Sequence, residues 1–324
     1  MFHGTSPDTE WREVLGDRGR ELRFGGNRGQ SLPDGTTVSP GTARLLDDWW
    51  RSQLGDIRFD ELQQRCNLVL IRHQRSETLA LLDHENTELY MEARRLFCLL
   101  QLFGVPQYDR AVALDGSAEG ERINVRQVGE VDRFRKTAGS SRSPVTVRAL
   151  SAAADVSRIW REVIEVGQDF ARIRRGLGVL LDGLRQSFGQ ERLHQCVRAI
   201  EASILPQQGK TRRQFISRCQ TFAGADSEIA ATLGEAFDMR SAVEHVHEWD
   251  RALASRPAFD RESLAMKRTR QIESLACGIY RRILTVPVLR EHFRSDDSIG
   301  TYWSLSDECR HAVWGETLDV QGVS

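Results

Sequence analysis

The second half of the chain carries apolar residues at every third or fourth position, the spacing of one face of an α-helix. Short polar or proline-containing stretches interrupt this pattern, so residues 151–324 are predicted to form a helical domain, a bundle of five or six helices. The helices are predicted at 156–166 continuing into 170–188, at 191–205, 211–222, 226 to about 247, and 261–284. Gly176 and Gly178 mark either a break or a point of close packing, and the tail from 294 is expected to be a short docking element.

The first half of the chain is less regular. Residues 1–40 are rich in Gly, Asp, Arg and Ser with little periodicity, and they are predicted to form an irregular N-terminal arm. Residues 41–150 are predicted to form a smaller α/β module, which is followed by the helical domain, so that the protein as a whole is mostly α. Within and next to this module, helices are predicted at 40–54 and 86–103, strands at 66–73, 111–114 and 123–125, and a linker at 137–144.

Composition and charge restrict the classes of function. With 324 residues and 40% hydrophobic content the chain can bury a core, and its formal net charge of -1 argues against a protein that coats nucleic acid indiscriminately. The six cysteines are spread evenly without zinc-ligand spacing, so they are expected to be free buried thiols, and neither a metal nor another cofactor is predicted. The chain shows neither a signal peptide nor the roughly 20 apolar residues of a transmembrane helix, so a cytoplasmic protein without membrane contact is expected.

The stretch 237–249 places an arginine, a carboxylate and two histidines within a few helical turns. Arg240 interrupts the apolar stripe of its predicted helix, where a charged side chain needs a partner, a helix end or a subunit interface. At about 100° per residue, Glu244 and His247 lie on the same side of this helix as Arg240, whereas His245 lies far round it. An arginine that holds a phosphate and a histidine that moves a proton are suited to metal-free phosphodiester cleavage.

Two interpretations of this stretch remain open. In the first, Arg240 and Glu244 form an internal ion pair and the histidines cap the helix. In the second, Glu244 orients Arg240 or raises the pKa of a histidine, and Glu201 on a neighbouring helix is a second candidate for this supporting role. His194 and Cys196 have no recognisable third ligand or partner and are interpreted as an ordinary helix pair.

The sequence Met239-Arg-Ser-Ala-Val-Glu-His245 resembles the signature of HEPN domains, in which an Arg is followed after four to six residues by a His. The resemblance is closest to the Apea-like branch, whose motif reads aliphatic-Arg-Ser, three residues, then His. Two further segments, 196–205 and 215–219, resemble that branch's helix with an apolar-Ala-apolar-Glu pattern and its following Arg-bearing helix. The resemblance covers roughly residues 155–290.

The chain departs from the Apea-like pattern after the motif. Val246 stands where this branch commonly has Gly, and His247 also satisfies the Arg-to-His spacing, so His245 and His247 both remain candidates. HEPN toxins that are paired with a nucleotidyltransferase antitoxin carry a Tyr at the position of His247. Silencing by modification of that Tyr is therefore not expected here.

The resemblance implies a homodimeric, metal-independent endoribonuclease effector of the toxin or anti-phage defence type. Arg240 would hold the scissile phosphate of an RNA, and His245 or His247 would transfer a proton to or from the reacting oxygens, giving a 2′,3′-cyclic phosphate and a 5′-hydroxyl. The implied supporting residues are Glu244, Glu201 and Ser241, and the basic residues expected to hold flanking phosphates are Lys210, Arg212, Arg213 and Arg218. A regulatory protein is a further candidate partner, and the alternative function is a non-catalytic HEPN-like dimerisation or nucleotide-binding module.

Overall fold

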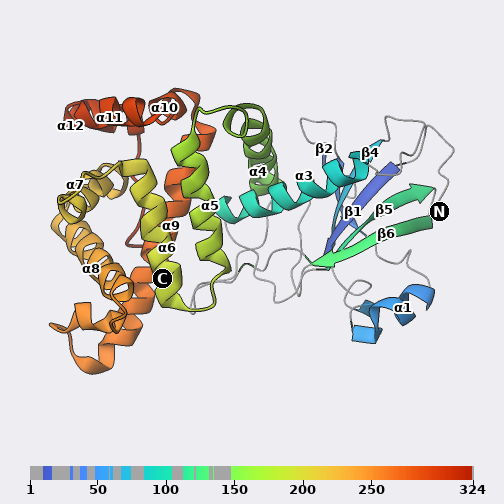
Figure 1. Cartoon of the computed structure of the whole chain (residues 1–324), viewed down its shortest axis with the longest axis horizontal. Coiled ribbons are helices and arrows are strands. Elements are labelled where there is room, and N and C mark those ends of the chain that lie inside the picture. Colours follow the sequence, from blue (N-terminus) through green and yellow to red (C-terminus); the bar gives the residue numbers. More distant parts are fainter. Residues whose placement is uncertain are drawn as a thin grey trace. The chain divides into compact units, whose positions relative to one another are not determined.

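The computed structural model of the chain (Figure 1) describes residues 10–16, 30–31, 37–41, 48–57, 59–60, 67–73, 84–103, 112–119, 122–130, 134 and 147–322. The chain forms two compact units, one made of residues 1–134 with 142–158 and the other of residues 135–141 with 159–324. The boundary before the helical part of the second unit therefore lies near residue 159, at the end of a helix, and not at residue 151. The predicted linker at 137–144 lies outside the described residues.

The first unit contains an antiparallel sheet of six strands in the order β2-β3-β4-β1-β5-β6. The strands are β1 (Glu10–Gly16), β2 (Gln30–Ser31), β3 (Thr37–Gly41), β4 (Asn67–His73), β5 (Val112–Glu119) and β6 (Arg122–Glu130). The helical elements are α1 (Asp48–Leu54), α3 (His84–Leu100), the 3-10 turn η2 (Gln101–Phe103) and α4 (Val147–Ile159). Helix α3 contacts β1, β4 and β5.

The N-terminal residues differ from the predicted irregular arm. Strand β1 lies inside the sheet and pairs with β4 on one side and β5 on the other, so its partners are far away in sequence. Local periodicity does not reveal a strand whose pairing is decided at such a distance. The predicted helix at 40–54 is also shorter, because Pro40 and Gly41 belong to β3 and the helix begins at Asp48. Side chains on the strands are outside the description, so the packing of a self-contained α/β module at 41–150 stays a prediction.

The second unit is built of helices, as the sequence predicts. Helix α6 lies within it and contacts α5, α7, α8 and α9 (Figure 1). The longer elements are α5 (Ala171–Arg185), α6 (Gly189–Ile204), α7 (Thr211–Ala223), α8 (Ser227–Glu244) and α9 (Ala258–Thr285). The shorter ones are the π-helix η3 (Trp160–Ile164), the 3-10 turn η4 (Trp249–Leu253), α10 (Pro287–His292), α11 (Asp296–Ser304) and α12 (Asp307–Trp314).

The helices between residues 156 and 188 are not continuous, in contrast to the prediction. Helix α4 ends at Ile159, η3 follows, and the chain then turns before α5 begins at Ala171. Gly167 and Phe170 both have positive φ in this turn, at 82° and 59°, which is incompatible with a continuing right-handed helix. Helix α5 itself runs unbroken through Gly176 and Gly178.

The tail after residue 294 belongs to the core of the second unit, so the expectation of a docking element is wrong. The Trp314 and Trp303 rings lie 4.4 Å and 5.6 Å from the ring of Phe222, between centroids. Trp303 is 7% exposed, so packing explains this side chain. Further along, the Leu318 side chain lies against Gly278, and its amide donates to the Phe222 carbonyl at 2.7 Å.

The described cysteines agree only in part with the expected buried thiols. Cys196 and Cys219 are fully buried, and burial raises the pKa of both thiols well above the ordinary value. Cys309 is exposed, because it lies in the first turn of the surface helix α12. Cys66 lies outside the described residues.

Helices α5, α6 and α9 pack closely against one another at a glycine. The Tyr280 hydroxyl of α9 donates to the Ala199 carbonyl of α6 at 2.8 Å, and Gly176 of α5 leaves the room for that hydroxyl. A β-carbon at Gly176 would lie 1.9 Å from the Tyr280 oxygen and 2.6 Å from the β-carbon of Ala202. Gly176 is thus the close-packing point, whereas a β-carbon at Gly178 would meet nothing within 4 Å.

Substitutions at these two glycines should therefore act in opposite directions. We expect Gly176→Ala to lower the free energy of unfolding by about 1–3 kcal/mol, because the added methyl group overpacks the three-helix contact. The matched control Gly178→Ala, on the exposed side of the same helix, should raise it by about 0.5–1 kcal/mol through helix propensity. Chemical denaturation followed by circular dichroism measures both values, and a Gly176→Ala protein as stable as Gly178→Ala would contradict the packing described.

Candidate functional site

Helix α8 carries the arginine of the motif close to its C-terminal end. The Asp226 carboxylate caps the start of the helix by accepting a hydrogen bond from the Ile229 amide at 2.7 Å. From there an apolar stripe runs along the buried side to Phe237, and Arg240 follows it. The Arg240 guanidinium carbon lies 5.7 Å from the centroid of the Phe237 ring, and the Arg240 side chain is 13% exposed. The arginine is therefore largely buried and needs partners.

Two carboxylates of the same chain provide them. Arg240 Nη1 donates to Glu244 one turn further along α8, and Nη2 donates to Glu201 Oε2 of helix α6 at 3.4 Å. Glu201 is 17% exposed and Glu244 is 44% exposed. Both carboxylates that the sequence singles out as supporting residues thus contact Arg240, one from inside the bundle and one from its surface.

Three polar atoms of this region are buried without a hydrogen-bond partner within the described part of the chain. They are Arg240 Nε, Glu201 Oε1 and His194 Nδ1. Burial raises the pKa of the Glu201 carboxyl; Arg240 opposes this effect and Glu244 adds to it. Unsatisfied buried polar atoms are uncommon in folded proteins and require an explanation, such as a ligand or a catalytic role.

His194 is a further titratable residue near this cluster that was not among the predicted site residues. Burial lowers the pKa of its imidazole, and the positive charges of Arg240 and Arg198 lower it further. The histidine interpreted as half of an ordinary helix pair therefore lies within electrostatic reach of Arg240. A signal was present in the sequence, because His194 and Glu201 are seven residues apart and so share one side of α6.

Helix α8 ends where the candidate histidines begin. Glu244 is its last residue, His245 is the C-cap, and Val246 has a φ of 59°. The Val246 amide donates to the Val243 carbonyl at 3.0 Å, and the His247 amide donates to the Ala242 carbonyl at 2.9 Å. These two bonds form a Schellman motif, which requires a left-handed residue at the position of Val246.

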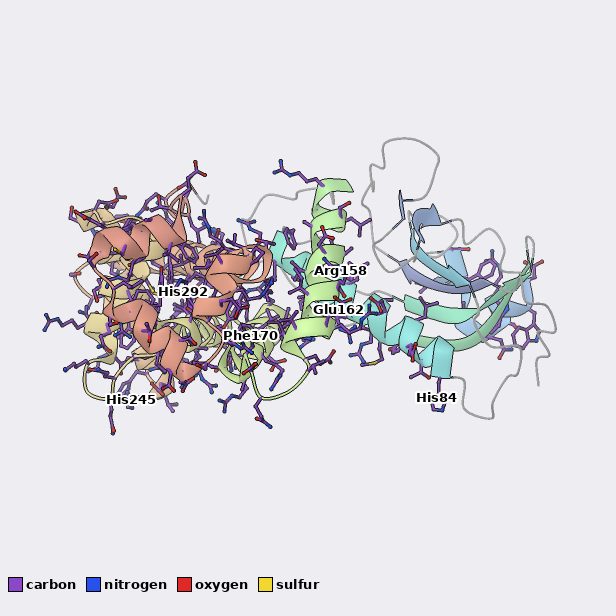
Figure 2. All side chains as sticks on the ribbon, turned by 90° about the horizontal axis from the view of Figure 1, so that it is seen from above. His84, Arg158, Glu162, Phe170, His245 and His292 are labelled. Carbon is purple, nitrogen blue, oxygen red and sulfur yellow. The ribbon has the colours of Figure 1, made fainter. Side chains whose placement is uncertain are left out.

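This turn changes the predicted relation between Arg240 and the histidines. A continuous helix to His247 would have put Arg240, Glu244 and His247 on one side, but the helix ends at Glu244, so this arrangement is wrong. His245 and His247 are both exposed, and Figure 2 shows His245 at the surface of the second unit. Neither imidazole makes a hydrogen bond with Arg240 among the described residues. Ser241 takes part in the turn through its carbonyl, which accepts from the His245 amide at 3.2 Å.

Three of the four candidate basic residues line one surface hollow of about 450 Å³ at the start of α7. They are Lys210, Arg212 and Arg213. Arg212 makes two hydrogen bonds of 2.7 Å to the carboxylate of Asp238. Asp238 precedes Arg240 by two residues, or about 200° of rotation, so Arg212 reaches the opposite side of α8 from the Arg240 side chain. The structure thus groups these basic residues with one another and not with Arg240.

Arg218, the fourth basic residue, has a different environment. Its Nη1 donates to the Ile204 carbonyl and, at 2.9 Å, to the Leu205 carbonyl at the end of α6, and its guanidinium carbon lies 5.2 Å from the Trp303 ring centroid. Burial lowers its pKa, and nearby Arg310 lowers it further. Arg218 is half-buried and caps the end of α6, so its guanidinium is already bound to carbonyl groups of the same chain.

Comparisons with known proteins add no further constraint. No protein-family model matches the chain, no curated protein matches it, and no solved structure matches it. Among the described helices none has both the length and the apolar character to cross a membrane. The described residues also include no group of three or more His, Cys, Asp or Glu side chains placed to hold a metal ion.

Removal of the Arg240 side chain should destabilise the protein. We expect Arg240→Ala to lower the free energy of unfolding by about 3 kcal/mol, because it leaves Glu201 as an unpaired, mostly buried carboxylate. The matched control is Arg294→Ala, which breaks the pair of Arg294 with Asp169 at 2.7 Å between side chains that are 54% and 50% exposed. This surface pair should contribute at most about 1 kcal/mol, and equal losses in the two variants by urea denaturation would contradict the burial of the Arg240 network.

Replacement of Val246 should instead stabilise the protein. A β-branched residue with positive φ is strained, so we expect Val246→Gly to raise the free energy of unfolding by about 0.5–1 kcal/mol, after allowance for the flexibility of glycine in the unfolded chain. Val246 is 94% exposed, so no packing is lost. The control Val288→Gly, at an exposed helical position of α10, should lower stability by about 0.5 kcal/mol. Thermal denaturation of the three proteins gives the comparison, and a destabilised Val246→Gly variant would contradict the left-handed turn.

Proposed function

We propose that the chain is a metal-independent endoribonuclease effector of the toxin or anti-phage defence type, acting in the cytoplasm as a homodimer. The observation that supports the proposal best is the environment of Arg240. Two carboxylates orient its guanidinium within a few residues of the exposed His245 and His247. An arginine whose donors are fixed before the substrate binds can recognise a phosphate without further ordering.

In the proposed mechanism the phosphate of an RNA takes the place of one carboxylate on Arg240. Glu244 is the group that gives way, because it is the more exposed of the two and lies in the last turn of α8. Glu201 stays in place inside the bundle and keeps the guanidinium oriented. Arg240 then stabilises the negative charge that develops on the phosphate oxygens, while a histidine transfers the proton of the ribose 2′-hydroxyl or of the leaving oxygen.

The second candidate function is a non-catalytic dimerisation or nucleotide-binding module. One observation favours it: both Nη atoms of Arg240 are already paired with carboxylates of the same chain, and the side chain is 13% exposed. In this alternative the Arg240 network only holds α8 against α6. The two proposals differ in whether the network has a substrate.

RNA cleavage in the presence of EDTA discriminates between them. We expect the wild-type protein to cleave labelled RNA, to leave 2′,3′-cyclic phosphate ends, and to spare the same oligonucleotide when its riboses are 2′-deoxy. Arg240→Lys keeps the positive charge beside Glu201 but loses the planar fork of donors, so it should cleave about 100-fold more slowly or worse. Arg294→Lys is the matched control and should cleave like the wild type.

Two outcomes would support the alternative. If no RNA is cleaved by well-folded wild-type protein, or if Arg240→Lys cleaves at the wild-type rate, the ribonuclease proposal fails. Circular dichroism of each variant ensures that a loss of cleavage is not a loss of folding.

A further inference from the structure

His194 lies in the first half of α6. Near the start of this helix, a β-carbon on Gly189 would lie 3.0 Å from the ring of Trp249, which follows α8 in the chain. Near its end, Glu201 lies 3.4 Å from Arg240. The start of α6 and the end of α8 therefore lie at the same end of the bundle (Figure 1). His194, between these two contacts, lies beside the last residues of α8 and the turn that follows.

His194 also lies on the same side of α6 as Glu201. His194 and Glu201 are separated by about 700° of rotation, so they lie within about 20° of the same side of α6. Since Glu201 contacts Arg240, this is the side of α6 that faces α8. The electrostatic influence of both Arg240 and Glu244 on His194 is consistent with this placement.

Three residues near the end of α8 carry buried atoms with unused hydrogen-bonding capacity. His194 Nδ1, Glu201 Oε1 and Arg240 Nε are buried atoms without partners within the residues that the structure describes. The His194 ring can accept or donate a proton, and the Glu201 carboxylate accepts hydrogen bonds when it is ionised. The Arg240 guanidinium is a permanent cation. Such a set can bind a polar anionic group that carries a transferable proton.

We infer that His194 belongs to the Arg240 site and is the base that takes the 2′-hydroxyl proton in the ribonuclease reaction proposed above, on which this inference rests. In this step the proton of the ribose 2′ O–H bond moves to the imidazole, and the 2′ oxygen forms a bond to phosphorus. The bond from phosphorus to the 5′ oxygen breaks, and that oxygen leaves with the electron pair and takes a proton from solvent. The imidazole later returns its proton to solvent.

The environment of His194 favours a base rather than an acid. The charged groups that act on it are Arg240 and Glu244 from α8, and Arg198 and Glu191 from its own helix. Burial and the two arginines outweigh the two carboxylates, so the pKa of His194 is lowered. A histidine with a lowered pKa is neutral near pH 7 and accepts a proton, and it loses this ability only as the pH falls through the lowered pKa.

The test is the pH dependence of RNA cleavage in EDTA by the full-length wild-type protein and by His194→Gln. The wild-type rate should fall at acid pH, with a midpoint below the ordinary histidine pKa of about 6.5. His194→Gln should cleave at least about 100-fold more slowly and should lose this acid limb, which a purely structural role would leave in place. His311→Gln, on α12, is the matched control and should keep the wild-type rate and profile.

A second measurement does not depend on activity. In an NMR titration of the histidine rings, Arg240→Gln should raise the pKa of His194, because a neighbouring positive charge is removed, whereas Arg294→Gln should leave it unchanged. An unchanged pKa in Arg240→Gln would exclude His194 from the Arg240 site.

The outcomes separate this inference from the proposed function. If wild-type protein cleaves RNA and His194→Gln does so at the same rate and with the same pH profile, the inference is overturned and the ribonuclease stands. If wild-type protein cleaves no RNA, the ribonuclease and the role of His194 as its base fail together, and the NMR titration alone decides whether His194 and Arg240 share a site.

Discussion

The contact between α5, α6 and α9 is the constraint on which the orientation of α6, and of the residues that it presents to α8, depends. A missing side chain at Gly176 lets the Tyr280 hydroxyl reach the Ala199 carbonyl, and this contact fixes the rotation of α6 about its own axis. Residues two positions apart lie on roughly opposite sides of a helix, so fixing Ala199 inward against α9 turns Glu201 towards α8. The location of the Arg240 site is thus decided by apolar packing on the other side of α6.

Carboxylates outnumber guanidinium groups at the Arg240 site. One guanidinium, which stays charged at any relevant pH, faces two carboxylates, so the cluster has an excess of acceptors. Burial raises the pKa of Glu201 and lowers that of His194, which brings the two pKa values closer together. Shifted pKa values in one cluster are typical of functional sites, although ion-pair networks that only stabilise a fold also shift them.

Sequence patterns predicted the elements that depend on local information. Helices α6 and α7 lie within two residues of their predicted bounds, because apolar periodicity and flanking turn residues define them locally. The end of α8 was placed three residues too late, since Val246 adopts a left-handed conformation that glycine usually signals. The position of His194 beside Arg240 was overlooked, although its seven-residue spacing from Glu201 puts both on one side of α6. The contacts of Arg218 could not be predicted for a different reason: its partners lie on other helices, and no spacing along the chain encodes them. Strand β1 was missed in the same way, through partners distant in sequence.

The last described residues contact three different helices. Leu318 packs on Gly278 of α9 and bonds to the Phe222 carbonyl of α7, and the Gln321 amide donates to the Thr232 hydroxyl of α8 at 3.2 Å. Helix α8 is thus held at two places along its length. Near its end Arg240 contacts Glu201 of α6, and near its start Thr232 contacts Gln321 of the segment after α12. A change in the packing of residues 315–322 would therefore also reach the helix that carries the arginine.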